Sequence, residues 1–155
     1  MSDIKRQPYG ISDFTDLRRQ NMYYTDKTQY ISTMEKAGNF LFLIRPRRFG
    51  KSVFLSMLAA YYDIARQDKF DELFDSLWIQ QHPTEMKGQF QVMHLDFSQV
   101  NVDKGNLEEL FHAYCSDVLV SFAEKYAAYY DEAFVDTVKQ RTPNSTRTPW
   151  STSRT

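Results

Sequence analysis

The sequence has almost no cysteine and no long hydrophobic run, and both absences narrow the class of protein. Cys115 is the single cysteine among 155 residues, so no disulfide can form within the chain. No apolar stretch approaches the roughly 20 residues that a membrane-spanning helix needs. The polar N-terminus, MSDIKRQPYG, lacks the apolar segment of a signal peptide. We therefore expect a cytoplasmic protein with no membrane partner.

Acidic residues are absent from one internal stretch, residues 37–62. The net charge of the whole chain is −1, so its overall charge indicates no particular partner. Four basic residues nevertheless fall within this stretch: Arg45, Arg47, Arg48 and Lys51. A basic cluster in a nearly neutral chain predicts a local site for an anion.

Hydrophobic patterning predicts both helices and strands. The apolar fraction, 42%, is enough for a sizeable core. The apolar run Phe40–Ile44 is typical of a strand that is buried on both faces of a parallel sheet. Gln89–Phe97 is a second strand candidate, in which Val92, Met93, Leu95 and Phe97 are apolar. Helical spacing of apolar residues predicts helices over residues 12–20, 26–36, 51–65, 68–77 and 106–138, the last as one helix or two.

The basic cluster lies in a segment that resembles a phosphate-binding loop. The consensus is G-x-x-x-x-G-K-[ST] between a strand and a helix, and the segment Arg45–Ser52 reads RPRRFGKS. Three of the four fixed positions match, and Arg45 replaces the first glycine. The loop therefore predicts the binding of ATP with Mg²⁺.

Each residue type in this loop suits phosphate chemistry. Gly50 lets the backbone approach a phosphate closely, and Lys51 can reach the β- and γ-phosphates. The Ser52 hydroxyl suits Mg²⁺, which prefers oxygen ligands. The arginines add bidentate donors. The predicted nucleotide-binding residues are Arg45, Arg47, Arg48, Phe49, Gly50, Lys51 and Ser52.

The loop and its neighbouring elements predict an α/β fold. Strand, loop, helix and second strand form a βαβ unit, as in the three-layer P-loop NTPases. Only two firm strands can be identified, so we expect an incomplete version with a short parallel sheet flanked by helices. Asp96 ends the second strand about 45 residues after Lys51 and is the predicted second Mg²⁺ ligand. The alternative role for Asp96 is the capping of a turn.

Four motifs together make the sequence similar to the bacterial AAA-ATPase-like family. They are the N-terminal Pro8–Ile11 with Asp13-Phe14, the Y-x-D-K-T segment Tyr24–Thr28, the loop Arg45–Ser52, and His94–Ser98, which contains L-D-F-S. The resemblance covers residues 7–140 and implies an ATPase-like domain. It also implies that Arg45 in place of glycine belongs to the family's own pattern.

The resemblance further implies a longer architecture. Many relatives end in a PD-(D/E)XK nuclease-like domain, which implies a nucleic-acid partner for the full-length protein. The Ser/Thr/Pro/Arg-rich residues 141–155 do not match the family's continuation, and their composition predicts disorder. We interpret residues 1–140 as a truncated N-terminal part, in which an oligomer is one way to complete the sheet.

Hydrolysis and base recognition are not assigned by the sequence. Phe97 stands where many ATPases carry a water-activating glutamate, so no catalytic residue is identified. Tyr23 and Tyr24 have two interpretations, stacking on adenine or packing in the core. Asp26 is interpreted as a helix cap and Lys27 as a solvated charge. The alternative function is a non-catalytic fragment whose Arg-rich loop binds nucleic acid or other polyanions.

Overall fold

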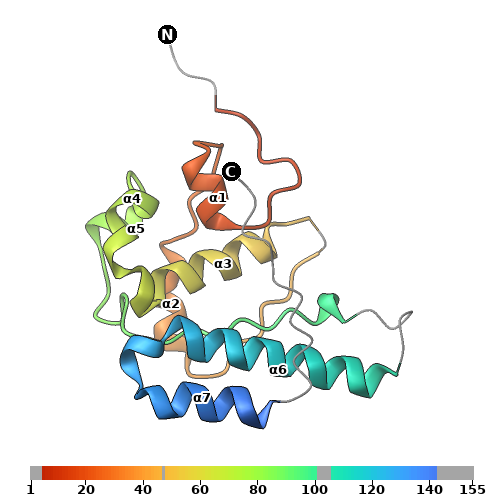
Figure 1. Ribbon diagram of the computed structural model, residues 1–155. Helices are drawn as coiled ribbons and strands as arrows, with labels where there is room; N and C mark the ends of the chain where they lie inside the picture. The colour runs from red at the N-terminus through yellow and green to blue at the C-terminus, as the bar shows by residue number, and fades with distance from the viewer. Residues whose placement is uncertain (1–4, 47, 101–105, 143–155) are drawn as a thin grey trace. The chain divides into compact units, whose positions relative to one another are not determined.

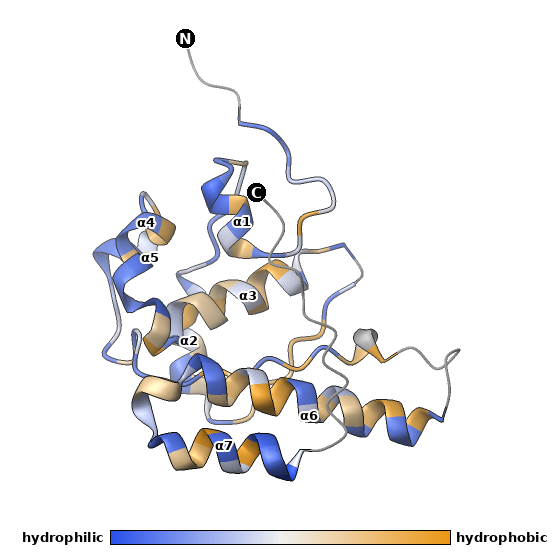
Figure 2. Ribbon diagram, viewed as in Figure 1, coloured by the Kyte–Doolittle hydropathy of each residue, from blue (hydrophilic) through white to orange (hydrophobic). Residues whose placement is uncertain are grey.

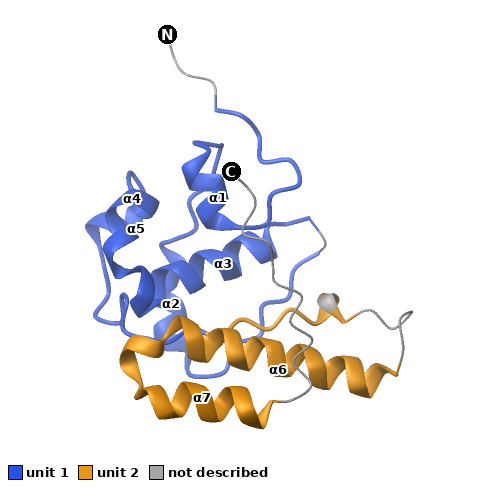
Figure 3. Cartoon of the chain, in the orientation of Figure 1, with its two compact units in different colours: residues 1–92 blue, residues 93–155 orange. Residues whose placement is uncertain are grey.

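The computed structural model describes residues 5–46, 48–100 and 106–142. The chain divides into two compact units, residues 1–92 and residues 93–155 (Figure 3). Each unit has its own helices, and the two are described separately below.

Unit 1 consists of short helices joined by irregular segments (Figure 1). Its elements are α1 (Phe14–Arg19), α2 (Tyr30–Ala37), α3 (Lys51–Tyr62), the 3-10 helix η1 (Ile64–Lys69), α4 (Phe70–Phe74) and α5 (Trp78–Gln81).

The core of unit 1 forms around one face of α3. Phe54, Met57 and Tyr61 recur at helical spacing, are almost fully buried, and pack with Phe14 of α1 and Phe74 of α4. Helical residues three and four apart share a face, so this spacing directs one side of α3 inward. The other side of α3 is more accessible, and Leu55 there is 40% exposed.

Hydrogen bonds fix α1 to its two neighbours. The Phe14 backbone N–H donates to the Ser56 hydroxyl at 2.6 Å, inside the core. The Arg18 guanidinium donates to the carbonyls of Leu73 and Asp75, at 2.8 and 2.6 Å. These last two carbonyls lie at the end of α4, where helical carbonyls lack intrahelical partners. The arrangement of α1, α3 and α4 is therefore set by polar contacts as well as by packing.

Unit 2 contains a pair of helices. Its elements are η2 (Phe97–Gln99), α6 (Leu107–Lys125), η4 (Ala127–Tyr129) and α7 (Glu132–Arg141). Both α6 and α7 carry hydrophobic and hydrophilic stripes (Figure 2). Val120 and Ala123 of α6, Tyr126, and Val135 of α7 are buried, and the Lys139 ammonium lies 3.1 Å from the Glu124 carboxylate.

The α/β fold class predicted from the sequence is wrong for the described residues, which contain no β-strand. Phe40–Ile44 lies outside regular secondary structure, with Phe40, Phe42 and Ile44 each more than 90% exposed. The second predicted strand makes a single parallel bridge, between Asp63 and Phe90. Strands need neighbouring strands to receive their backbone hydrogen bonds, and an apolar run alone does not supply them. The incomplete three-layer sheet is therefore not found.

The predicted helices are found in the structure, although several begin or end at other residues than predicted. Helices were found in all five predicted regions, and the last region contains two, α6 and α7. The helix predicted from residue 26 begins only at Tyr30, because Asp26 and Thr28 bind another part of unit 1. The helix predicted to reach residue 65 ends at Tyr62, where Asp63 caps the following 3-10 helix.

Among the described residues, no helix is both long enough and apolar enough to cross a lipid bilayer. The predicted start of the tail at residue 141 overlaps the last residue of α7, and residues 143–155 lie outside the described part of the chain.

Two phenylalanines test the corrected fold. Phe74→Ala should lower the free energy of unfolding by about 3–5 kcal/mol, because it empties a fully buried ring site. Phe42→Ala should change it by less than about 0.5 kcal/mol, because Phe42 is 93% exposed. Urea denaturation followed by circular dichroism measures both values. A loss of several kcal/mol for Phe42→Ala would instead place Phe40–Ile44 in a core, as the sequence predicted.

Candidate functional site

The start of α3 is an open helix N-terminus preceded by a left-handed glycine. Gly50 has φ 71° and ψ 25°, and α3 begins at the next residue, Lys51. The first helical hydrogen bond runs from the Phe54 N–H to the Gly50 carbonyl at 2.9 Å. No side chain of the described residues caps the helix, and no acidic residue lies in its first turn. The first N–H groups of α3 are thus available to an anion, and the helix dipole favours negative charge there.

In the loop before α3, the side chain of Arg45 contacts the backbone of Phe49. Its guanidinium donates to the Phe49 carbonyl at 3.5 Å and lies 5.8 Å from the centre of the Phe54 ring. Arg48 has φ 69°, a left-handed conformation that costs a non-glycine residue roughly 1–2 kcal/mol. Arg45, which replaces the first glycine of the motif, therefore connects the two ends of the loop through its side chain.

The predicted loop residues are largely accessible. The exposed side chains are Arg48, Phe49, Lys51 and Ser52, while Arg45 is half-buried. Arg47 lies outside the described residues. The structure thus brings the described loop residues together at one end of α3.

A second segment, Tyr24–Thr28, is anchored on α5. One oxygen of the Asp26 carboxylate accepts hydrogen bonds from the Thr28 backbone N–H at 2.8 Å and from its hydroxyl at 2.7 Å. The other oxygen accepts from the Trp78 N–H at 2.7 Å, and the Thr28 hydroxyl oxygen accepts from the Ile79 N–H at 3.2 Å. Asp26 is therefore a cap, as interpreted from sequence, but for α5 and not for the helix that follows it.

Lys27, between these two anchors, reaches the loop glycine. Its ammonium nitrogen lies 3.5 Å from the position that a Cβ on Gly50 would occupy. Lys27 is half-buried, and no carboxylate forms an ion pair with it in the described part of the chain. The interpretation of Lys27 as a solvated charge is therefore corrected. The Y-x-D-K-T motif marked the segment, but no sequence signal placed it beside residue 50.

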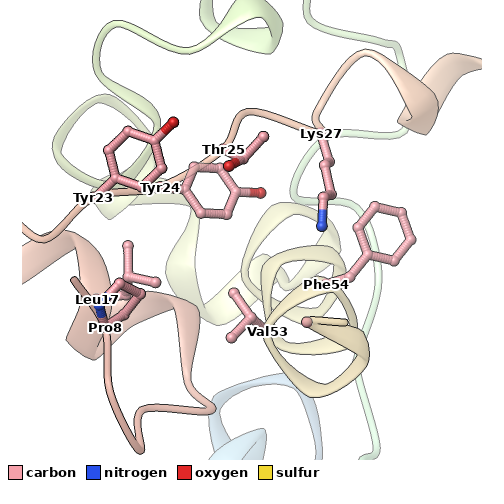
Figure 4. Close-up of a pocket in the computed structure, with 9 residues that line it drawn as sticks. Pro8, Leu17, Tyr23, Tyr24, Thr25, Lys27, Val53 and Phe54 are labelled. Atoms are coloured by element: carbon pink, nitrogen blue, oxygen red, sulfur yellow. The ribbon is translucent and has the colours of Figure 1, made fainter. Parts of the chain in front are cut away.

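A pocket of about 150 Å³ lies between this segment and α3 (Figure 4). Most of its lining is apolar or aromatic, and the Lys27 ammonium points into the space above α3. The lining residues are Pro8, Leu17, Tyr23, Tyr24, Thr25, Lys27, Gly50, Val53 and Phe54.

Tyr24 is partly a core residue. Its ring meets Phe14 edge-on at 5.2 Å, whereas Tyr23 is 56% exposed. The Tyr24 hydroxyl is buried and has no hydrogen-bond partner among the described residues. Burial, followed by the charge of Asp26, raises the pKa of Tyr24 to about 12. The Lys27 backbone N–H has a smaller, opposite effect and lowers the pKa of the Tyr24 hydroxyl, although it does not form a hydrogen bond of good geometry with that hydroxyl.

Asp96 belongs to unit 2, in contrast to the loop. One of its carboxylate oxygens accepts hydrogen bonds from the Ser98 N–H at 3.0 Å and from the Ser98 hydroxyl at 2.7 Å. These bonds cap η2, which is the alternative role that the sequence left open for Asp96. Its pairing with Ser52 around Mg²⁺ stays a prediction.

Comparison with known proteins agrees with the motifs of this site. A family model described as "Predicted AAA-ATPase" matches residues 8–150, which is most of the chain. The chain belongs to this AAA-ATPase-like family. The family resemblance inferred from the four motifs is therefore confirmed.

This AAA-ATPase-like chain is also similar to a protein of Azotobacter chroococcum mcd 1, described as "Uncharacterized protein in vnfD 5'region". The two are 44% identical over 59 residues, which is 37% of this chain and 11% of that relative. The matched region thus spans only a small part of the relative's length. No solved structure matches the chain.

The Asp26 anchor should contribute to stability. Asp26→Ala removes three hydrogen bonds to a carboxylate and should lower the free energy of unfolding by about 2 kcal/mol. Glu85→Ala, which removes an exposed carboxylate between α5 and the Phe90 bridge, is the matched control. Thermal and urea unfolding measure both variants. Equal stabilities would contradict the anchoring role.

Tyr24 should make unfolding sensitive to alkaline pH. Because the pKa of Tyr24 is higher in the folded protein than the ordinary 10.0, the unfolded chain loses this proton first. The contribution of the Tyr24 titration to the free energy of unfolding is therefore constant below a pH of about 10, and it falls as the pH rises from about 10 to about 12. Tyr24→Phe should flatten this fall, measured by urea unfolding across that range.

The matched control for that titration is Tyr9→Phe, because Tyr9 is 99% exposed. Burial and a hydrogen bond to Glu35 also raise the pKa of Tyr62, so Tyr24→Phe should reduce the slope without abolishing it. A slope unchanged by Tyr24→Phe would be inconsistent with a buried Tyr24 hydroxyl.

Proposed function

We propose that this chain binds ATP together with Mg²⁺ through the loop Arg45–Ser52. The observation that carries the proposal is the left-handed Gly50 at the open N-terminus of α3, within the sequence Gly50-Lys51-Ser52. This is the local geometry in which backbone N–H groups bind phosphate, and it occurs here without the predicted sheet.

Local charge supports an anionic ligand. Residues 37–62 contain no carboxylate, while Arg45, Arg48 and Lys51 lie at or next to the start of α3. Phosphate is the biological anion for which arginine forks and helix N-termini are both suited. The family membership adds the expectation that the phosphates belong to a nucleotide.

Mg²⁺ fits the oxygen chemistry of the site. The Ser52 hydroxyl is accessible and is a hard ligand of the kind that Mg²⁺ prefers. No group of three His, Cys, Asp or Glu side chains gathers as a metal cage in the described ranges. Mg²⁺ would therefore depend on the nucleotide phosphates, with Ser52 as the protein ligand from this loop, and it would supply charge neutralisation there.

No catalytic base is assigned to this site. The contacts of the whole protein with nucleic acid, its self-association and its cytoplasmic location stay predictions.

The test is a calorimetric titration of ATP with and without Mg²⁺. Lys51→Ala should raise the Kd at least tenfold, because it removes a charge-assisted phosphate contact. Lys36→Ala, at an exposed lysine in the last turn of α2, should leave the Kd unchanged.

The salt dependence of the same titration separates nucleotide binding from general polyanion binding. Nucleotide binding predicts a requirement for Mg²⁺. Binding to single-stranded DNA that falls steeply with salt and ignores Mg²⁺ would favour the polyanion alternative. ATP binding that survives Lys51→Ala would refute the assignment of this loop.

A further inference from the structure

Lys27 approaches the phosphate loop from a separate segment. The segment Tyr24–Thr28 precedes α2, whereas Gly50 precedes α3, and 22 residues separate Lys27 from Gly50 in the printed sequence. The 3.5 Å between the Lys27 ammonium and the Cβ position on Gly50 is a van der Waals distance. Any group that binds at the loop glycine therefore comes within reach of this ammonium.

Among the described residues, no carboxylate forms an ion pair with Lys27. The adjacent Asp26 has both carboxylate oxygens in hydrogen bonds with Thr28 and Trp78. The second cation in this region, Arg45, lies over the Phe54 ring, and Phe54 also lines the pocket. Partly buried cations without an anion are unfavourable, because burial removes hydration that no counter-charge replaces. A bound anion would relieve this cost.

The Tyr24 hydroxyl is a second unsatisfied group beside Lys27. In the described part of the chain it has no hydrogen-bond partner of good geometry, although the Lys27 backbone N–H lies close to it, and it is directed toward the Lys27 side of the pocket (Figure 4). Buried polar groups normally have partners, and one without a partner at a pocket is a candidate for contact with a ligand. An acceptor oxygen beside Lys27 would be able to satisfy the phenol O–H.

The position of Lys27 is held by its neighbours. Asp26 and Thr28 on either side bind the first two N–H groups of α5, and Thr28 is fully buried. The backbone that carries Lys27 is thus fixed at both sides, which limits the entropy lost when the ammonium binds a ligand.

We infer that Lys27 is a second phosphate-binding lysine, which acts with the loop Arg45–Ser52 on the polyphosphate of the bound nucleotide. This inference rests on the proposed ATP binding. In the Y-x-D-K-T segment, Asp26 and Thr28 anchor the backbone, Lys27 contacts phosphate oxygen, and the Tyr24 hydroxyl donates to the same anion.

The test compares Lys27→Met with Lys51→Ala in titrations of ATP and of inorganic tripolyphosphate, each with Mg²⁺. Lys27→Met should raise both Kd values by about ten- to hundredfold, the range for loss of one charge-assisted hydrogen bond. Lys27→Arg should retain part of the affinity because it keeps the charge. Lys36→Met is the matched control and should change neither value.

A thermal melt of each variant separates binding from folding. Lys27→Met should melt at or above the wild-type temperature, since it removes a half-buried unpaired charge. If Lys27→Met is destabilised, Lys27→Gln, which keeps a polar end, provides the same comparison.

The outcomes distinguish this inference from the proposal on which it rests. ATP binding that is lost in Lys51→Ala but normal in Lys27→Met would overturn the role of Lys27 and leave the loop assignment intact. Weakened ATP binding with unchanged tripolyphosphate binding would also overturn it, because Lys27 would then contact the nucleoside. A folded wild-type protein that binds neither ligand would overturn both.

Discussion

Burial of one face of α3 is the constraint on which the described structure of unit 1 depends. Phe54, Met57 and Tyr61 hold this helix in the core, and α1 and α4 pack around it. Because the buried face begins at Phe54, the first turn of α3 projects from the core with its N–H groups uncapped. The same packing that stabilises the helix therefore presents Gly50, Lys51 and Ser52 to solvent, where phosphate can reach them.

The second part of the site depends on hydrogen bonds that connect distant parts of the sequence. Asp26 and Thr28 lie about 50 residues before the α5 N–H groups that they cap. Sequence reasoning assigned a local cap to Asp26 because caps usually act on the helix that follows them. The actual partners decide the direction of Lys27, and this explains why a residue interpreted as a solvated charge lies beside Gly50.

The sequence predicted the helices and the loop because their determinants are local. Helical spacing of apolar residues and the Gly50-Lys51-Ser52 triplet are each readable within a dozen residues. Phe40–Ile44 was predicted as a strand from equally local evidence, but a strand also needs partners elsewhere in the chain. In the described residues those partners are absent, and the apolar side chains of Phe40 and Phe42 are exposed. The proximity of Lys27 to Gly50 was missed for the same reason, since it is non-local.

The loop and the Lys27 segment share one physical property, which is the presence of basic groups that form no ion pair in the described part of the chain. The helix dipole, Arg45 and Lys27 all add positive charge near Phe54 or Gly50, and no carboxylate of residues 37–62 opposes them. A protein selected for stability alone would gain from an acidic cap at the start of α3, because such caps contribute about 1 kcal/mol. The left-handed Arg48 adds a further backbone cost in the same loop. Strain and like charge concentrated at one helix end are the features that support the proposed binding of an anion there.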